Sequence, residues 1–142
     1  MSPRWLPDPV VRRGRSVVSD LHAHLVFITR RRRDALDEAM LRRCEQAMRE
    51  VCLQMGADLR KFHGGDDHVR LLVHYPPKLA VSTLVNRLKA VSAHYLAIEF
   101  TGQIDQAFVD GHLWSPSYFA ASCGGAPLKI IEDYIEAQKL PI

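Results

Sequence analysis

Two segments with strand character lie on either side of four turn-forming residues, Gly64-Gly65-Asp66-Asp67. In the run that follows, His68-Val69-Arg70-Leu71-Leu72-Val73, polar and apolar side chains alternate, as they do on a strand with one buried face. Residues 57–63, before the turn, have a weaker strand pattern. This turn chemistry between two strand-like segments predicts a β-hairpin, so the chain should contain an antiparallel sheet.

Further strands and helices are expected on both sides of this hairpin. Residues 22–29 are rich in β-branched and aromatic side chains and predict a strand. A helix capped by Asp34 is expected to run to about Met55, because apolar residues recur at helical spacing and Gly56 follows. The remaining predicted elements are a helix over about 79–100, a strand around 112–122, and a last helix from 126 or 127 to about 139.

The order β-α-β-β-α-β, followed by one more helix, predicts an α+β protein of the ferredoxin-like, split βαβ class. One antiparallel sheet should then carry two helices on one face. The other face is left for a ligand, a partner or the C-terminal helix. Residues 1–16 are polar and rich in proline, and we interpret them as an irregular basic N-terminal arm before a single domain at 17–142.

Composition points to a cytoplasmic protein. No apolar run reaches the roughly 18 residues that a membrane helix requires, and the N-terminus has no apolar signal region. The cysteines, Cys44, Cys52 and Cys123, are odd in number and lack CxxC spacing. We therefore expect buried free thiols, a cytoplasmic location and no membrane association.

Positive charge is concentrated near the N-terminus. Residues 1–33 contain eight arginines and two acidic residues, and arginine outnumbers lysine in the whole chain by 14 to 5. The planar guanidinium suits phosphate oxygens, so the basic region suggests a nucleic-acid partner. Candidates for contacts to a nucleic-acid backbone are Arg12, Arg13, Arg15, Arg30, Arg31, Arg32, Arg33, Arg87 and Lys89.

The chemistry-bearing residues fall on the hairpin and on the last helix. His68 and position 70 share a face of the predicted strand, where two histidines would make a metal-ligand pair, but position 70 is Arg70. Tyr134 and Gln138 lie four residues apart and project from one side of the helix. A tyrosine hydroxyl near a divalent ion can attack a phosphodiester, and the Gln138 amide oxygen is a suitable further ligand.

The combination resembles the single-tyrosine HUH transposases of the insertion-sequence 200/605 group. The resemblance runs through His24-Leu25-Val26-Phe27, Asp67-His68-Val69-Arg70-Leu71-Leu72-Val73, Leu113-Trp114-Ser115-Pro116-Ser117-Tyr118-Phe119 and Tyr134-Ile135-Glu136-Ala137-Gln138. It implies a homodimer acting on hairpins of single-stranded DNA at element ends. It also implies that Tyr134 is the catalytic nucleophile and that His68 and Gln138 hold Mg²⁺ or Mn²⁺.

Arg70 departs from that family, which has histidine at this position. A guanidinium only donates hydrogen bonds and repels a nearby divalent ion. Three hypotheses follow. The chain is a defective or domesticated DNA-binding relative, another group among Asp66, Asp67 and His63 completes the metal site, or Arg70 itself contacts the scissile phosphate.

The sequence thus predicts a metal-dependent DNA transposase that cleaves and rejoins single-stranded DNA through a 5′-phosphotyrosine intermediate. The alternative is a catalytically impaired single-stranded DNA-binding relative, because of Arg70. A small RNA-binding or metabolite-binding ferredoxin-like protein would fit the composition and the order of elements equally well.

Overall fold

The structure, a computed structural model, describes residues 12–13, 18–103, 108–109, 111–122, 134 and 136–137. Short 3₁₀ turns lie at Arg30–Arg32 and Thr101–Gln103. The strands and helices, in chain order, are β1 (Arg12–Arg13), β2 (Val18–Ser19), β3 (His22–Ile28), α1 (Glu38–Gln54), β4 (Asp58–Gly64), β5 (His68–His74), α2 (Val81–Glu99) and β6 (Phe119–Ser122).

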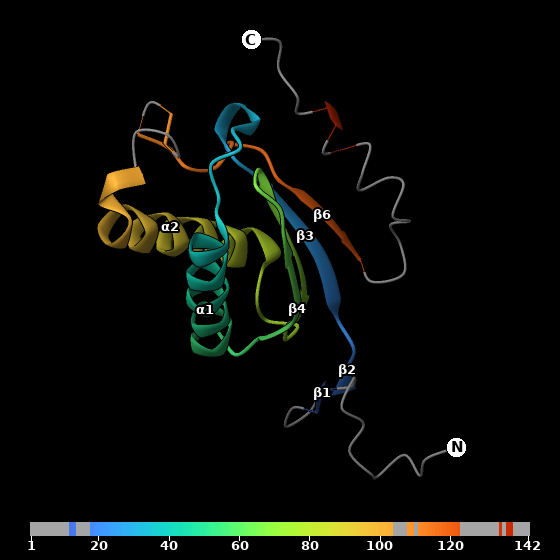
Figure 1. Cartoon of the computed structure of the whole chain (residues 1–142). Coiled ribbons are helices and arrows are strands. Elements are labelled where there is room, and N and C mark those ends of the chain that lie inside the picture. The colour runs from blue at the N-terminus through green and yellow to red at the C-terminus, as the bar shows by residue number, and fades with distance from the viewer. Residues whose placement is uncertain are drawn as a thin grey trace.

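Four strands form one sheet in the order β4-β5-β3-β6, and every neighbouring pair is antiparallel. Helices α1 and α2 cover one face of this sheet (Figure 1). The two central strands, β3 and β5, are the first and third strands of the sheet along the chain, as in a split βαβ arrangement. The predicted ferredoxin-like α+β fold is therefore confirmed.

The core lies between the sheet and the two helices. Leu25 and Phe27 of β3 face it together with Val69 and Leu71 of β5, and none of these side chains is more than 2% exposed. Each contributes about 1.5–3 kcal/mol relative to an exposed position. Because strand side chains alternate, the even-numbered residues of β3 and β5 lie on the opposite side of the sheet, here called the open face.

The predicted hairpin is confirmed, and a glycine at its turn leaves space for a histidine ring. Strands β4 and β5 pair up to Gly64 and Val69, and the Gly65 N–H donates to the His68 carbonyl at 2.9 Å. A Cβ at position 65 would lie 2.8 Å from His68 Cε1. Glycine at this position therefore allows the imidazole to lie directly against the turn.

Helix α1 begins later than predicted. Its N-cap is Asp37 rather than Asp34, and the Asp37 carboxylate accepts a hydrogen bond from the Met40 N–H at 2.8 Å. The N–H groups of residues 35 and 36 donate instead to the Asp66 carbonyl, each at 2.9 Å. These bonds hold the segment against the hairpin turn, so the helix starts only after it.

The last strand of the sheet is shorter than the predicted 112–122. Strand β6 spans only Phe119–Ser122, although Trp114 forms an isolated bridge with Thr29. Pro116 has no N–H for a ladder. The Trp114 side chain enters the core, where its indole N–H donates to Ser92 Oγ at 3.0 Å.

The two ends of the chain are described only in part. Strands β1 and β2 pair antiparallel, so Arg12–Arg13 of the arm predicted to be irregular form a short strand. The domain boundary expected after residue 16 stays a prediction. Most of the helix expected at 126–139 lies outside the described residues, among which Tyr134, Glu136 and Ala137 have helical conformation.

The described cysteines behave as the sequence suggests. Cys44 and Cys52 are buried free thiols, and burial raises the pKa of both to about 12. Cys123 lies outside the described residues. Among the helices that are described, none is both long enough and apolar enough to cross a membrane.

Candidate active site on the open face of the sheet

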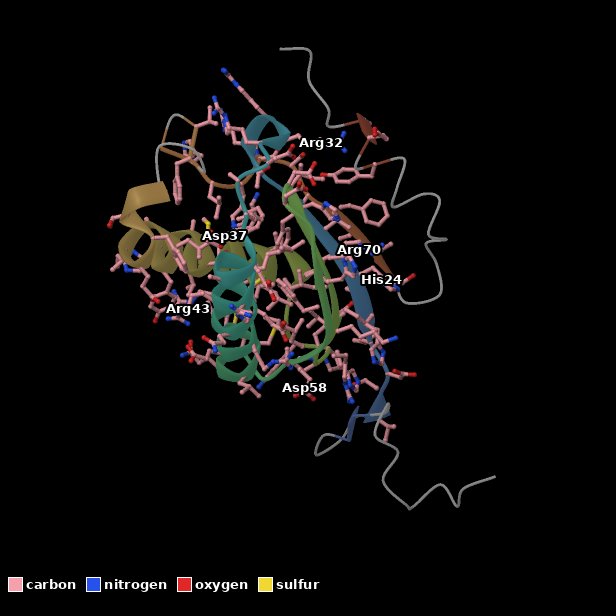
Figure 2. All side chains as sticks on the ribbon, in the orientation of Figure 1. His24, Arg32, Asp37, Arg43, Asp58 and Arg70 are labelled. Atoms are coloured by element: carbon pink, nitrogen blue, oxygen red, sulfur yellow. The ribbon has the colours of Figure 1, made fainter. Side chains whose placement is uncertain are left out.

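The sheet register brings the candidate residues of different strands into rows on the open face. One row runs from His63 of β4 through Arg70 and Val26 to Phe119 of β6. In the next row, His68 of β5 pairs with Ile28 of β3. Figure 2 shows Arg70 and His24 on the side of the sheet away from α1. The strand alternation predicted for His68 and Arg70 is therefore observed.

His68 is oriented by a carboxylate that is itself held in place. Its Nδ1 lies 2.7 Å from Asp67 Oδ1, and Arg32 Nε donates to Asp67 Oδ2 at 2.6 Å. Since a carboxylate only accepts hydrogen bonds, the neutral His68 ring carries its proton on Nδ1. Its Nε2 then presents a lone pair for a proton or a metal ion.

The Asp67 carboxylate is buried and stays ionised. Burial raises its pKa, but the hydrogen bonds from His68 and Arg32 outweigh that effect and lower the pKa below its ordinary value. The hydrogen bond to Asp67 in turn raises the pKa of Arg32. The three side chains therefore form a charged, hydrogen-bonded unit at the start of β5.

The turn after β3 has an unusual backbone conformation, which places the Arg32 side chain against Asp67. Arg31 and Arg32 both have positive φ, 57° and 51°, which non-glycine residues adopt rarely. Thr29 stabilises the turn, because its carbonyl accepts from the Arg32 N–H and its hydroxyl donates to the Arg33 carbonyl. The Thr29 N–H also donates to the Asp67 carbonyl at 2.9 Å, which joins the turn to β5. Strained backbone of this kind is common at functional sites.

Tyr134 packs on the open face against β3, the strand next to His68 and Arg70. Its ring contacts the cluster formed by Val26 and Ile28, which are the strand partners of Arg70 and His68 respectively. The Phe119 ring lies 5.4 Å away, centroid to centroid. The predicted nucleophile and the predicted histidine thus lie on the same part of one chain's sheet.

Two polar contacts position the tyrosine segment. The Tyr134 hydroxyl is 3.1 Å from Ser117 Oγ, and Arg32 Nη1 lies 3.4 Å from the Glu136 carboxylate. Because Arg32 also binds Asp67, this segment is linked to the partner of His68 through one guanidinium.

Arg70 differs from its neighbours because it has no counter-ion among the described residues. Its Nε is buried and has no hydrogen-bond partner among the residues that the structure describes. Arginine cannot supply a lone pair to a metal, and its charge repels a divalent ion at the neighbouring His68. Position 70 therefore does not fit a two-histidine metal centre.

The other proposed ligands do not restore that histidine pair. Both oxygens of Asp67 are engaged, by His68 and Arg32. Asp34, Asp66 and Asp67 bring three carboxylates within 4.8 Å of one another, which makes this group a possible acidic metal site at the turn. His63 is exposed on β4 beside Arg70. Gln138 lies outside the described residues.

A second histidine cluster lies at the other end of the open face. Asp20, His22 and His74 have potential ligand atoms within 4.8 Å of one another. The two rings stack with centroids 4.2 Å apart, and Arg60 Nη2 donates to His74 Nδ1 at 3.0 Å. Because the rings are stacked and a guanidinium is bound to one of them, we interpret this group as a packed cluster rather than as a set of ligands for one ion.

The structure separates the nucleic-acid candidates into groups. Arg30, Arg31 and Arg33 adjoin Arg32 in the turn at the end of β3; Arg32 contacts Asp67, whereas Arg30 lines a hollow with Lys89 and Trp114. Only the backbone of Arg12 and Arg13 is described, and Arg15 lies outside the described residues.

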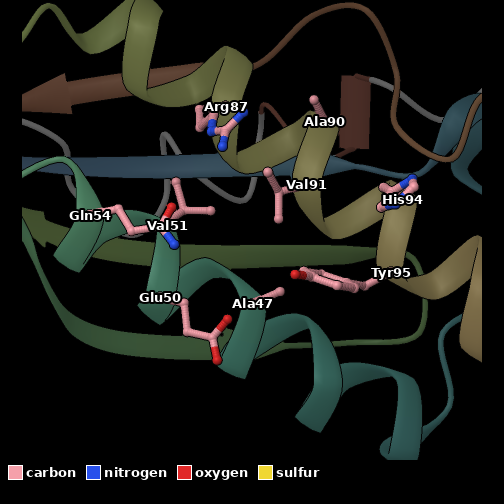
Figure 3. A pocket seen from close by; sticks show the side chains of 9 residues that line it. All are labelled: Ala47, Glu50, Val51, Gln54, Arg87, Ala90, Val91, His94 and Tyr95. Carbon is pink, nitrogen blue, oxygen red and sulfur yellow. The ribbon is translucent and has the colours of Figure 1, made fainter.

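The two candidates on α2 differ in their surroundings. Arg87 lines a hollow between α1 and α2 together with Glu50 and His94 (Figure 3). Lys89 Nζ donates to the Ser115 carbonyl at 2.7 Å, and burial lowers its pKa. Lys89 therefore has an internal partner that anchors the segment before β6.

Sequence reasoning missed several residues that shape the site. Asp67 was considered as a metal ligand, yet it orients His68. Phe119 packs against Tyr134 on the open face. Ser117 and Glu136 had no recognisable sequence signal. The adjacency of Asp67 and His68 was the one signal that could have been used.

Comparison with known proteins identifies the family. Residues 17–138 match the family model described as "Transposase IS200 like". The chain belongs to the IS200-like family of transposases, as the sequence resemblance suggested. It is 27% identical over 128 residues to the ISDra2 transposase TnpA of Deinococcus radiodurans, covering 90% of this chain and 91% of that protein. It is also 28% identical over 115 residues to the transposase of insertion sequence element IS200 of Salmonella typhimurium, covering 81% and 74%.

Solved structures agree with this assignment. A crystal structure of a Deinococcus radiodurans protein assigned as a transposase superposes with a TM-score of 0.81 at 27% identity, covering 92% of this chain and 99% of that one. A REP-associated tyrosine transposase bound to a REP hairpin gives a TM-score of 0.56 at 12% identity, covering 88% and 68%. The second likeness shows a shared fold.

Proposed function

We propose that this transposase cleaves and rejoins single-stranded DNA at hairpin-bearing element ends, with Tyr134 as the nucleophile. The observation that carries the proposal is the packing of Tyr134 on Val26 and Ile28, the strand partners of Arg70 and His68. A phenol, an oriented imidazole and a guanidinium are thereby gathered on one surface. These are the groups that phosphodiester transfer to a tyrosine needs.

The reaction is a transesterification. The Tyr134 Oη forms a bond to phosphorus, and the bond from phosphorus to O3′ breaks with its electron pair on the leaving oxygen. The product is a 5′-phosphotyrosine and a free 3′-OH. The reverse reaction rejoins DNA and requires no external energy.

His68 is the proposed proton carrier. A phenol has a pKa near 10, so it needs a base or a cation nearby to become a nucleophile. The Asp67 hydrogen bond leaves His68 Nε2 as the acceptor nitrogen, which takes the phenol proton as the new bond forms. A proton on the same atom can then pass to the departing O3′.

The family resemblance implies Mg²⁺ or Mn²⁺ held by His68 and Gln138, within a homodimer. The described side chains do not fit a histidine-pair metal centre, because position 70 is arginine. The steps above therefore use only side chains of this chain. A homodimer and a cytoplasmic location remain part of the proposal.

The DNA partner is proposed from charge and from a structural relative. Arg30, Arg31 and Arg33 belong to the turn at the end of β3 from which Arg32 reaches Asp67, and their guanidinium groups suit the sugar–phosphate backbone. The REP-associated tyrosine transposase of the same fold is bound to a hairpin. A second candidate function, single-stranded DNA binding with impaired cleavage, is favoured by one observation, the arginine at position 70.

Tyr134→Phe tests the proposed function. The protein is incubated with a panel of hairpin-bearing oligonucleotides labelled at the 3′ end, since the downstream fragment carries the phosphotyrosine. We expect a labelled covalent adduct on a denaturing gel for the wild type and none for Tyr134→Phe. Tyr95→Phe is the matched control, because Tyr95 lies on the helical side beneath Arg43. Binding without an adduct under every condition would favour the impaired relative.

A further inference from the structure

The guanidinium of Arg70 belongs to a residue of the open face and could bind an anion there. Arg70 lies on the open face between His63 and Val26, and Tyr134 packs on Val26. Directly paired residues on one face of a sheet have Cβ atoms about 4.5–5.5 Å apart. The Arg70 side chain therefore starts next to the residues that support the Tyr134 ring.

Arg70 has no negative partner within the described part of the chain, and its buried Nε donates to no acceptor there. Other arginines do pair with carboxylates, namely Arg32, Arg42, Arg43, Arg49 and Arg60. An unsatisfied buried donor on a charged group is costly to maintain, and a bound anion would remove that cost.

The chemistry of this anion follows from the guanidinium and its neighbours. A guanidinium stays protonated and donates through a planar fork that matches two phosphate oxygens. His68 Nε2 lies on the same strand face, and Tyr134 covers the adjacent strand. A phosphate bound by Arg70 would therefore lie on the same face of the sheet as an acceptor nitrogen and a phenol.

We propose that Arg70 binds the non-bridging oxygens of the phosphodiester that Tyr134 attacks, so that cleavage and joining by this chain do not require a divalent metal ion. This inference rests on the proposed function, because it assigns a substrate group to the same site. Arg70 donates hydrogen bonds and transfers no proton. The phenol proton passes to His68 Nε2 and the leaving O3′ takes one up, so the reaction balances without a co-reactant.

The first experiment measures anion binding without DNA. Inorganic phosphate is titrated into the protein in EDTA, and the melting temperature is followed. We expect phosphate to raise the Tm of the wild type and of Arg42→Gln, an arginine substitution on the exposed side of α1. Arg70→Gln should lose this shift, and Arg70→Lys, which keeps the charge, should retain part of it. An equal shift in Arg70→Gln would overturn the proposal.

The second experiment measures the metal directly. Binding of Mn²⁺ is followed by the loss of its free-ion electron paramagnetic resonance signal. We expect Arg70→His to bind Mn²⁺ at least tenfold more tightly than the wild type. Tight binding by the wild type, unchanged in Arg70→His, would contradict the repulsion assigned to Arg70.

The third experiment uses hairpin-bearing oligonucleotides in EDTA or with Mg²⁺ or Mn²⁺. We expect the wild type to form the Tyr134 adduct equally fast in both media. Arg70→Gln should be about 10²–10³-fold slower, the effect of removing one preorganised donor. In Arg70→His the adduct should depend on the added metal.

The outcomes separate this inference from the proposed function. A wild-type adduct that forms only with metal would support tyrosine-mediated cleavage and overturn the role of Arg70. An Arg70-dependent phosphate shift with no adduct under any condition would support the anion site and reject cleavage. If the wild type shows neither the phosphate shift nor the adduct, the anion site and the proposed cleavage are both rejected.

Discussion

Two histidines at opposite ends of β5, His68 and His74, lie on the same open face, yet their partners are of opposite kinds. Asp67 accepts a hydrogen bond at His68 Nδ1, whereas Arg60 donates one to His74 Nδ1. The His68 side chain is 18% exposed. His74 is 1% exposed and stacks on His22.

The difference shows how a neighbour decides what an imidazole can do. A carboxylate partner fixes the proton on Nδ1, so the lone pair of His68 is directed outward on Nε2. A guanidinium partner uses the Nδ1 lone pair of His74 and leaves the proton on Nε2. Strand alternation gives both histidines the same face, but only His68 retains an accessible acceptor.

Glutamine substitution at the two histidines should give the largest contrast. In His68→Gln the amide still donates to Asp67 but cannot take a proton, so adduct formation should fall about 10²–10⁴-fold with little change in stability. His74→Gln should lose about 0.5–1.5 kcal/mol from the ring stack while keeping the adduct rate of the folded protein. Adduct kinetics and urea unfolding measure the two effects.

The contrast would fail if the two variants behaved alike. Equal loss of adduct formation, with both proteins folded, would place His74 in the chemistry as well. A large loss of stability in His68→Gln alone would make His68 a packing residue rather than a proton carrier.

Replacing the carboxylate partner should have a smaller effect on activity. Asp67→Asn keeps the shape but removes the charge that fixes the His68 tautomer, and changes in such partners cost about 10–100-fold in activity. Arg32 also loses its ionised acceptor, so we expect a loss of about 1–3 kcal/mol in unfolding free energy. Adduct kinetics and urea midpoints at pH 7 check both numbers.

The matched control for Asp67→Asn is Asp58→Asn. Asp58 Oδ2 lies 4.0 Å from Nη2 of Arg60, the residue that donates to His74, at the other end of the sheet. The Asp58→Asn substitution should leave the adduct rate unchanged. A slow Asp58→Asn would indicate that both ends of the open face take part in the reaction.

Much of the fold was predictable because it depends on local patterns. Alternating side chains and the Gly64–Asp67 turn determined the β4–β5 hairpin, and helical spacing determined α1 and α2. The start of α1 was misplaced because the Asp66 carbonyl binds the backbone of residues 35 and 36, a contact between distant segments. Strand β6 was overextended because Pro116 has no N–H for a ladder, so pairing with β3 is confined to Phe119–Ser122.

The residue types of the site could be predicted from the sequence, but the hydrogen bonds and ion pairs that link them could not. His68 and Tyr134 were identified from spacing and resemblance, and the sheet register places them on one surface. The link from Glu136 through Arg32 to Asp67 spans more than one hundred positions and depends on two residues with positive φ. No sequence window contains that information.

The smallest expected effect concerns pH, and it tests the carboxylate that distinguishes the two histidines. Hydrogen bonds from His68 and Arg32 lower the folded-state pKa of Asp67, while its unfolded value is about 3.9. Between those two values the unfolded chain binds more protons, so stability rises with pH in that window. The contribution of Asp67 should therefore be complete above about pH 4 and be lost as pH falls through the folded pKa. Urea midpoints of wild type and Asp67→Asn, measured from pH 7 down to pH 3, should differ by a constant amount above about pH 4 and draw closer below it. A difference that stays constant over the whole of that range would mean that the charge of Asp67 does not hold the His68 end of the sheet.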